Sequence, residues 1–147
     1  DPSAFAMEQY AWHTQFSHLA WHQQLNDRWQ LVAQWMNGNT EMGPGVVNVD
    51  FNLWFLLANY QLDDWQFSAR LDHWQQRDRD LTPLDDNNGN GEGLTASVQY
   101  QWTPEISVQL EWLLIDTSQQ SRGQWQHWPI DRKFGQSSLL LVWRLPE

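Results

Sequence analysis

The residues with the clearest chemical potential are oxygen-bearing side chains between positions 85 and 92, where Asp, Asn and Glu alternate with Gly. Carboxylate and amide oxygens are the ligands that Ca²⁺ prefers, but the run lacks the 12-residue spacing of an EF-hand loop. Compositions of this kind also occur in solvated loops. The sequence therefore offers a calcium candidate, with a solvated loop as the alternative, and the candidate ligands are Asp85, Asp86, Asn88, Asn90 and Glu92.

The other residues with catalytic or metal-binding potential do not form a site. His18 and His22 are four positions apart, which in a β-strand separates them by about 13 Å, too far to ligate one metal ion. No Gly-x-Ser-x-Gly motif provides a nucleophile. The absence of cysteine excludes thiolate catalysis, disulfides and cysteine zinc sites. We therefore predict no enzymatic activity, no cofactor and no metal site apart from the calcium candidate.

The composition points away from nucleic acid and toward an aromatic-rich surface. The formal net charge is −10 with only 8 Lys and Arg, whereas nucleic-acid binding requires basic residues that neutralise phosphates. Of the 147 residues, 12 are Trp, whose rings and N–H groups suit a membrane interface. The mean hydropathy of −0.68 is compatible with a membrane barrel, because barrel strands expose only every second residue to lipid.

Apolar residues recur with a period of two along most of the chain, which predicts β-strands. In segment 94–102, for example, Leu94, Val98 and Trp102 share one parity, while Thr95 and Gln99 share the other. The same alternation assigns to the apolar face Val47, Val49, Phe51, Leu53, Phe55 and Leu57. The predicted strands lie near 10–25, 28–37, 46–61, 65–75, 94–102, 106–116 and 137–145, within a single region that spans 1–147.

Tight links and long polar loops alternate between the predicted strands. Three-residue links are predicted after Leu25, Gln61 and Trp102, and each leaves its flanking residues opposite one another on the apolar face. The long loops are 38–45, 76–93 and 117–136. Short turns at one end and long loops at the other are typical of outer-membrane barrels. We therefore predict an all-β, antiparallel transmembrane β-barrel, and since bacterial barrels have even strand numbers, seven strands indicate part of a larger one.

The two faces of such strands have different predicted roles. On the apolar face, tryptophans would form aromatic girdles at the borders of the membrane; the candidates are Trp21, Trp29, Trp35, Trp65, Trp102, Trp112 and Trp143. The polar face would line a water-filled lumen, in which an excess of acids over bases favours cations or neutral solutes. The pore-lining candidates are Asn48, Asp50, Asn52, Arg70, Asp72, Gln99, Gln109, Glu111 and Arg144.

Four stretches carry a resemblance to a known family. They are Trp12–Phe16, Trp29–Gly38, Ala69–Asp72 with the Asp/Asn/Gly-rich loop behind it, and Leu110–Trp112. Through them, residues 11–147 resemble the C-terminal region of Gram-negative outer-membrane porins, in the broad group that includes phosphate-selective-porin-like proteins. The basic ladder of a phosphate-selective channel is absent. The resemblance therefore implies the barrel fold and the bacterial outer membrane (cell envelope) without that specificity.

These observations lead to two hypotheses of different classes. The first is a porin-like channel component through which small hydrophilic solutes diffuse passively, with the lipid bilayer and the barrel-assembly machinery as partners and homo-oligomers as an option. The alternative is a soluble Trp-rich β-sandwich or barrel that binds carbohydrate through indole faces. The residues that face lipid in the first hypothesis and form a core in the second are Leu94, Val98, Leu110, Phe51 and Phe55.

Overall fold

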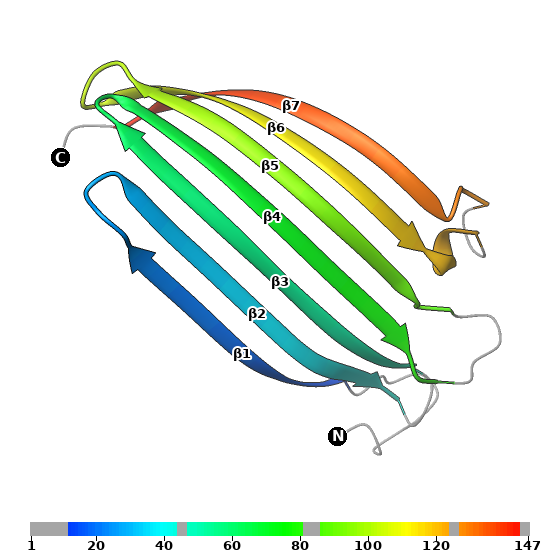
Figure 1. Ribbon diagram of the computed structural model, residues 1–147. Helices are drawn as coiled ribbons and strands as arrows, with labels where there is room; N and C mark the ends of the chain where they lie inside the picture. Colours follow the sequence, from blue (N-terminus) through cyan, green and yellow to red (C-terminus); the bar gives the residue numbers. More distant parts are fainter. Residues whose placement is uncertain (1–11, 44–46, 81–85, 124–126, 145–147) are drawn as a thin grey trace.

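The computed structural model describes residues 12–43, 47–80, 86–123 and 127–144. These residues form one sheet of seven antiparallel strands, in which each strand pairs with the next along the chain (Figure 1). The strands are β1 (Trp12–Gln24), β2 (Trp29–Met42), β3 (Val47–Leu62), β4 (Trp65–Asp78), β5 (Gly89–Gln101), β6 (Ile106–Gln119) and β7 (Asp131–Trp143). The prediction of an all-β antiparallel fold is confirmed. The sheet is open, with β1 and β7 at its opposite edges.

The strands extend further toward the long connections than the alternation predicts. β2 continues to Met42, β5 begins at Gly89 and β7 begins at Asp131, so the connections at this end are 43–46, 79–88 and 120–130. Most of the added residues are polar or glycine, and backbone pairing between such residues gives no period-two signal. A short helical turn follows β6 at residues 120–123. Within the described ranges, no helix is long and apolar enough to cross a membrane.

The link between β3 and β4 differs from the prediction and reverses the faces of β3. The sequence predicts three linking residues after Gln61, whereas the structure has two, Asp63 and Asp64, with Leu62 paired to Trp65. A register change of one residue moves every side chain of a strand to the opposite face. The residues of β3 that share a face with Trp65 are therefore Trp54, Leu56, Ala58, Tyr60 and Leu62. The assignment to that face was wrong for Val47, Val49, Phe51, Leu53, Phe55 and Leu57.

The other two tight links have the three-residue length that the sequence predicts. In the link 26–28, Asn26 Oδ1 accepts hydrogen bonds from the backbone N–H groups two and three residues ahead, at 2.9 and 3.0 Å. In the link 103–105, Thr103 Oγ1 accepts the equivalent bonds at 3.2 and 3.1 Å. Side-chain oxygens at the start of a turn satisfy backbone groups in this way. These two caps help to fix the register of β1 on β2 and of β5 on β6.

The geometry of the β3–β4 link leads to a prediction about stability. Asp63 has a φ of 51°, in the left-handed region that costs most non-glycine residues about 1–2 kcal/mol. Asp63→Gly is expected to keep or raise the free energy of unfolding, and Asp63→Val should lower it by about 1–2 kcal/mol. Urea titration of the refolded protein, followed by tryptophan fluorescence, measures both. Asp64→Val is the control, and an equal loss at positions 63 and 64 would contradict this link geometry.

Candidate functional site

The register divides the sheet into two faces, because side chains of residues paired across strands lie on the same face. We use the word rung for residues paired side by side across successive strands, such as Ala33, Leu56, Leu71, Leu94 and Leu114. On β2 to β6, every exposed large hydrophobic side chain belongs to the face of this rung, with between 37% and 56% of its surface exposed. These side chains are Trp29, Trp35, Trp54, Leu56, Leu62, Trp65, Phe67, Leu71, Leu94, Trp112 and Leu114.

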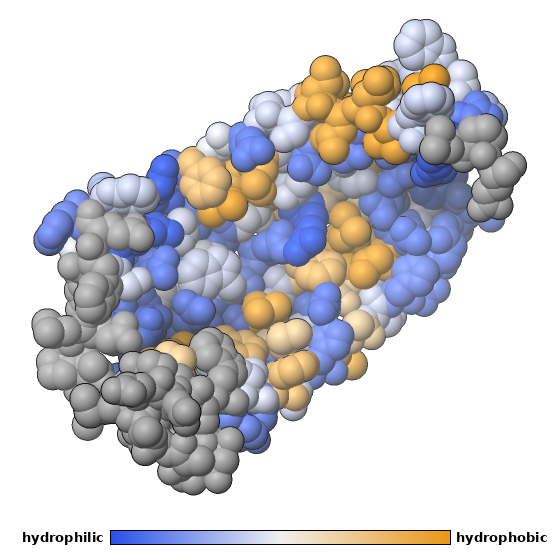
Figure 2. All heavy atoms as spheres, turned by 180° about the vertical axis from the view of Figure 1, so that it is seen from behind, coloured by the Kyte–Doolittle hydropathy of each residue, from blue (hydrophilic) through white to orange (hydrophobic). Residues whose placement is uncertain are grey.

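We call this face convex and the opposite face concave. Large apolar side chains on the opposite face, such as Phe55 and Ile115, are half-buried, as expected where curvature brings side chains together. Seen from behind Figure 1, the molecule is hollowed along its length, and hydrophilic and hydrophobic side chains lie together in the hollow (Figure 2). No hydrophobic residue in the described ranges is buried. This part of the chain therefore has an apolar convex face and no hydrophobic core.

A continuous row of aromatic rings crosses the convex face beside the tight links. The ring centroid of Trp29 lies 4.8 Å from that of Tyr60, and the centroid of Tyr60 lies 6.4 Å from that of Phe67. Trp65 continues the row, 6.3 Å from Phe67 and 4.7 Å from Tyr100. Offset and tilted aromatic pairs at these distances are favourable. This turn-end aromatic row extends from β2 to β5 along the border of the convex face, and all of its rings except Phe67 carry an N–H or O–H group.

A second aromatic group lies further along the convex face, toward the long connections. Trp35 pairs with Trp54 across β2 and β3, and Trp54 stacks on His73 of β4 with ring centroids 5.7 Å apart. Beyond these rings the same face becomes polar, beginning with the pair of Asn37 and Asn52. We call the stretch between the two aromatic groups the apolar band and the stretch beyond it the polar zone.

The polar zone contains paired charges. Asp50 on β3 accepts hydrogen bonds from Arg79 Nε at 2.5 Å and from Asn39 Nδ2 at 3.0 Å. Arg79 first, and then Asn39, lowers the pKa of the Asp50 carboxyl, which lies outside the apolar band. On β6 and β7, Asp116 and Lys133 form an ion pair at 2.7 Å. The convex face is thus charged near the long connections, whereas the apolar band carries no charged side chain among the described residues.

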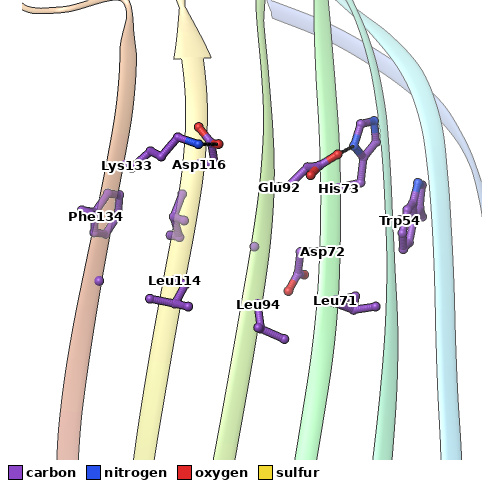
Figure 3. A pocket seen from close by; sticks show the side chains of 13 residues that line it. Trp54, Leu71, Asp72, His73, Glu92, Leu94, Leu114, Asp116, Lys133 and Phe134 are labelled. Atoms are coloured by element: carbon purple, nitrogen blue, oxygen red, sulfur yellow. Dashed lines mark ion pairs between the residues drawn. The ribbon is translucent and has the colours of Figure 1, made fainter.

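A hollow of about 710 Å³ lies on the convex face where the apolar band meets the polar zone (Figure 3). Its apolar wall includes Leu71, Leu94 and Leu114, which come from three neighbouring strands. Two ion pairs, drawn as dashed lines, stand on the side of the long connections. The two ion pairs therefore lie at one rim and the leucines further along the wall, with the Asp72 carboxylate between Leu71 and Leu94 (Figure 3).

Amide side chains gather on the concave face near the tight links. The Gln30 side chain is hydrogen-bonded to Nε2 of His22 at 2.8 Å and accepts a bond from Asn59 Nδ2 at 2.8 Å. The Gln34 side chain is hydrogen-bonded to Nε2 of His18 at 2.6 Å. The two histidines therefore bind separate amides of β2. These amide and imidazole groups link β1, β2 and β3 across this part of the concave face.

Arg70 is a cation near the middle of the concave face. Its Nε donates to Asp72 Oδ1 at 2.9 Å, and its guanidinium carbon lies 4.2 Å from the centre of the Phe55 ring. Arginine can stack on an aromatic ring and pair with a carboxylate at the same time. Because Arg70 and Asp72 offset one another, this part of the wall is polar with little net charge.

The structure divides the pore-lining candidates between the two faces. Those on the concave face are Arg70, Asp72, Gln99, Gln109 and Glu111, while Arg144 directly follows β7. Those on the convex face, in the polar zone, are Asn48, Asp50 and Asn52. The placement of these last three on a common lining with Arg70 was wrong. The physical reason is the two-residue link, which reverses β3 relative to β4.

All seven girdle candidates are exposed, namely Trp21, Trp29, Trp35, Trp65, Trp102, Trp112 and Trp143. Trp112 lies opposite Ala96, inside the apolar band rather than at its border. Trp54 shares the convex face with them, although sequence reasoning missed it because β3 was given the wrong parity. The available signal was the second alternation of that strand, formed by Trp54, Leu56, Ala58, Tyr60 and Leu62.

The described residues of the calcium candidate belong to two different parts of the structure, the connection before β5 and β5 itself. Asp85 lies outside the described residues. Asp86 Oδ1 accepts hydrogen bonds from the N–H and Nδ2 groups of Asn88, whereas Asn90 and Glu92 belong to β5. In the part of the chain that the structure describes, no group of three or more acidic or histidine side chains could hold a metal ion.

Comparison with protein-family models, curated proteins and solved structures gives no match. The resemblance to outer-membrane porins therefore stays a prediction.

Glycines on β5 leave room for an aromatic ring on the concave face. The indole of Trp74, on β4, lies against Gly89 and Gly91: a Cβ added to Gly91 would collide with the ring, 2.7 Å from Cε2. A Cβ added to Gly93 would meet only Asp72, at 3.4 Å or more, which is an ordinary contact. On the concave face of β5, the Trp74 indole therefore covers Gly89 and Gly91 and leaves Gly93 free of the ring.

This difference between the glycines is testable. Gly91→Ala should displace the Trp74 indole and lower the free energy of unfolding by about 1–3 kcal/mol, the usual cost of overpacking. Gly93→Ala, the matched control, should be neutral or raise it by up to about 1 kcal/mol through the unfolded state. Urea midpoints of the two variants measure the effects. Similar midpoints for both would contradict the packing of the indole on Gly91.

Proposed function

We propose that this chain is a wall segment of a transmembrane β-barrel in the outer membrane of a Gram-negative bacterium, through which small hydrophilic solutes diffuse passively. The observation that carries the proposal is the apolar band, in which the exposed large hydrophobic side chains of β2 to β6 all lie next to one another on the convex face. In water a contiguous apolar surface of this kind is an aggregation liability. In a bilayer it is the surface that every barrel strand presents to lipid.

The height of the band fits a membrane. On β3, Trp54 lies eight residues before Leu62, which corresponds to about 26 Å along the strand at ~3.3 Å per residue. Strands of transmembrane barrels are tilted by about 40°, which reduces this length to a height of roughly 20 Å. The apolar band of such barrels is about 25 Å tall. Aromatic rings at both ends of the band correspond to the two interfaces of a bilayer.

The border of the band also runs obliquely across the strands. One rung starts with Leu19, Trp35 and Trp54 on β1 to β3 and continues to Glu92 and Asp116 on β5 and β6. This rung is therefore apolar at its β1 end and charged at its β6 end. If the border of the apolar band were parallel to the rungs, all residues of one rung would have the same polarity. The strands must cross the band at an angle, as barrel strands cross a membrane.

The concave face supports passage of polar solutes. Near the tight links it carries amide and hydroxyl groups, among them Gln30, Asn59, Gln66, Ser68, Ser97, Gln99 and Gln109. Arg70 and Asp72 offset one another, and Asp50 belongs to the other face, so the excess of inward acids predicted from the sequence is reduced. The lumen we propose therefore favours neutral polar solutes. Toward the long connections Phe51 and Leu53 interrupt this polar lining.

The soluble carbohydrate-binding alternative needs the apolar band to form a core. Nothing in the described part of the chain covers the band. Phe51 and Phe55, which that alternative placed in one core with Leu94, lie on the concave face instead. Lipid covers the band without a second protein layer. Insertion by the barrel-assembly machinery and association of complete barrels into homo-oligomers belong to the same proposal.

Neighbouring small residues on β5 provide a direct test of lipid contact. Ala96 lies on the convex face opposite Ala69 and Trp112, and Ser97 lies on the concave face opposite Glu111. Ala96→Arg should make folding into bilayers less favourable by about 2–4 kcal/mol, the cost of an arginine near the midplane. Ser97→Arg, the control, should cost much less because it faces water. Folding titrations of the complete barrel into phosphatidylcholine vesicles measure both.

Two outcomes would overturn the membrane proposal. One is that Ala96→Arg and Ser97→Arg have equal costs in vesicles. The other is that the wild-type protein remains monomeric in buffer without detergent, with the apolar band protected from aqueous probes. The second outcome would favour the soluble alternative.

Ion selectivity tests which face lines the lumen. Glu111→Gln removes a carboxylate from the concave face and should shift the selectivity of planar-bilayer conductance toward anions. Asp50→Asn removes one from the convex face and should leave selectivity unchanged, because 1 M salt screens charges beyond about 3 Å. Reversal potentials in a salt gradient provide the measurement. A shift in Asp50→Asn with none in Glu111→Gln would show that the faces are assigned the wrong way round.

A further inference from the structure

Both edges of the sheet present rows of backbone hydrogen-bonding groups. Next to β7, the N–H of Arg144 donates to the carbonyl of Glu105. Since antiparallel strands alternate the direction of these groups, even-numbered residues of β7 bond to β6 and odd-numbered residues point away from it. Next to β1, the N–H of Leu25 donates to Trp29, so the even-numbered residues of β1 point away from β2. Only a further β-strand satisfies such a row along its whole length.

The side chains of β7 also lack cover, and on both faces. Leu139, Leu141 and Trp143 are 75%, 72% and 69% exposed on the convex face, and Leu140 and Val142 are exposed on the concave face. Free edges of soluble sheets are guarded by charges, prolines or bulges. Segment 137–143 contains no charged residue and no proline. This end of β7 therefore has the character of an inner strand whose neighbour is missing from the sheet.

The direction of the strands limits what that neighbour is. Seven antiparallel strands leave β1 and β7 running in the same direction, so direct pairing of β1 with β7 would be parallel. A second copy that crosses the membrane in the same orientation has only its own β1 and β7 as free edges. Both of these strands run in the direction of the first copy's β7, so pairing with either would again be parallel. Neither arrangement gives the all-antiparallel wall of bacterial barrels.

We infer that both edges dock further antiparallel strands of a different sequence, and that an odd number of such strands lies between β7 and β1 in the closed wall. The strand beside β7 carries apolar side chains on both faces where it meets Leu140 and Val142. Closure of the wall rests on the proposed membrane function, because unpaired backbone groups cannot remain in lipid. Pairing at each edge rests on the hydrogen-bonding rows alone.

Two neighbouring serines on β7 test the pairing. The N–H of Ser138 points toward β6 and that of Ser137 points away, so proline at 138 breaks the known ladder whereas proline at 137 is harmless on a free edge. In the protein as the cell makes it, Ser137→Pro is expected to abolish assembly in the outer membrane as fully as Ser138→Pro. Heat-modifiable migration in electrophoresis and protease resistance of the assembled protein are the readouts.

The results separate this inference from the proposed function. Normal assembly of Ser137→Pro, with failure of Ser138→Pro, would overturn pairing at β7 and leave the membrane proposal standing. Protection of the odd-numbered amides of β7 in the wild-type protein, together with equal costs for Ala96→Arg and Ser97→Arg, would support the edge pairing and overturn the membrane proposal. Amide exchange provides a second readout on the wild-type protein: odd-numbered amides of β7 should be as protected as those of β4.

Disulfide trapping tests the odd number of strands. Because the sequence contains no cysteine, the introduced cysteines have no native thiol to pair with. Ala20→Cys in β1 is combined in turn with Gln136→Cys, Ser138→Cys or Leu140→Cys in β7. One intervening strand already separates such residues by about 10 Å, beyond the 4.4–6.8 Å that a disulfide spans. No bond is expected within a chain or between copies. The control Glu111→Cys with Ser138→Cys joins paired residues and should oxidise readily, and any β1–β7 disulfide would overturn the inference.

Discussion

The pairing of Leu62 with Trp65 across a two-residue link fixes which side chains of β3 lie on each face of the sheet. A link one residue longer would place Phe55 and Leu57 beside Leu71 and would move Trp54 to the concave side. The aromatic row beside the tight links, the Trp35–Trp54 pair and the position of Asp50 all depend on this register. Because the side-chain period of a strand is two, a shift of one residue in this link would move every side chain of β3 to the opposite face. The chemistry of both surfaces therefore rests on the local conformation of Asp63 and Asp64.

The alternation of apolar and polar residues was sufficient to predict the antiparallel strands, because β5 and the first halves of β4 and β6 keep their apolar residues on one parity. It was not sufficient for β3, whose two parities are both largely apolar: Val49, Phe51 and Phe55 on one, Trp54 and Leu56 on the other. Only the turn distinguishes these alternatives. Asp63 and Asp64 can form either a two- or a three-residue link, and the left-handed φ of Asp63 that allows the shorter one is not visible in composition.

The lengths of the strands were underestimated for a different reason. Residues such as Gly89 and Gln119 are paired in the ladder, but they lie beyond the apolar band, where neither face needs hydrophobic side chains. Strand prediction from period-two patterns detects the burial of one face and not the backbone pairing itself. The ends of β5, β6 and β7 are thus strands that the sequence describes as loops. The same limit explains why Asn90 and Glu92 were grouped with a calcium loop although they belong to a ladder.

The oblique border of the apolar band, which crosses the rung from Leu19 to Asp116, has a consequence for the size of the lumen that we propose. A strand inclined to the axis of a cylinder occupies more of its perimeter than an upright one, by the reciprocal of the cosine of the tilt. With strands ~4.8 Å apart and a tilt of about 40°, seven strands cover roughly 44 Å of perimeter, more than the ~38 Å that eight upright strands would cover. In the barrel that we propose, inclined strands would therefore surround a wider lumen than the same number of upright strands.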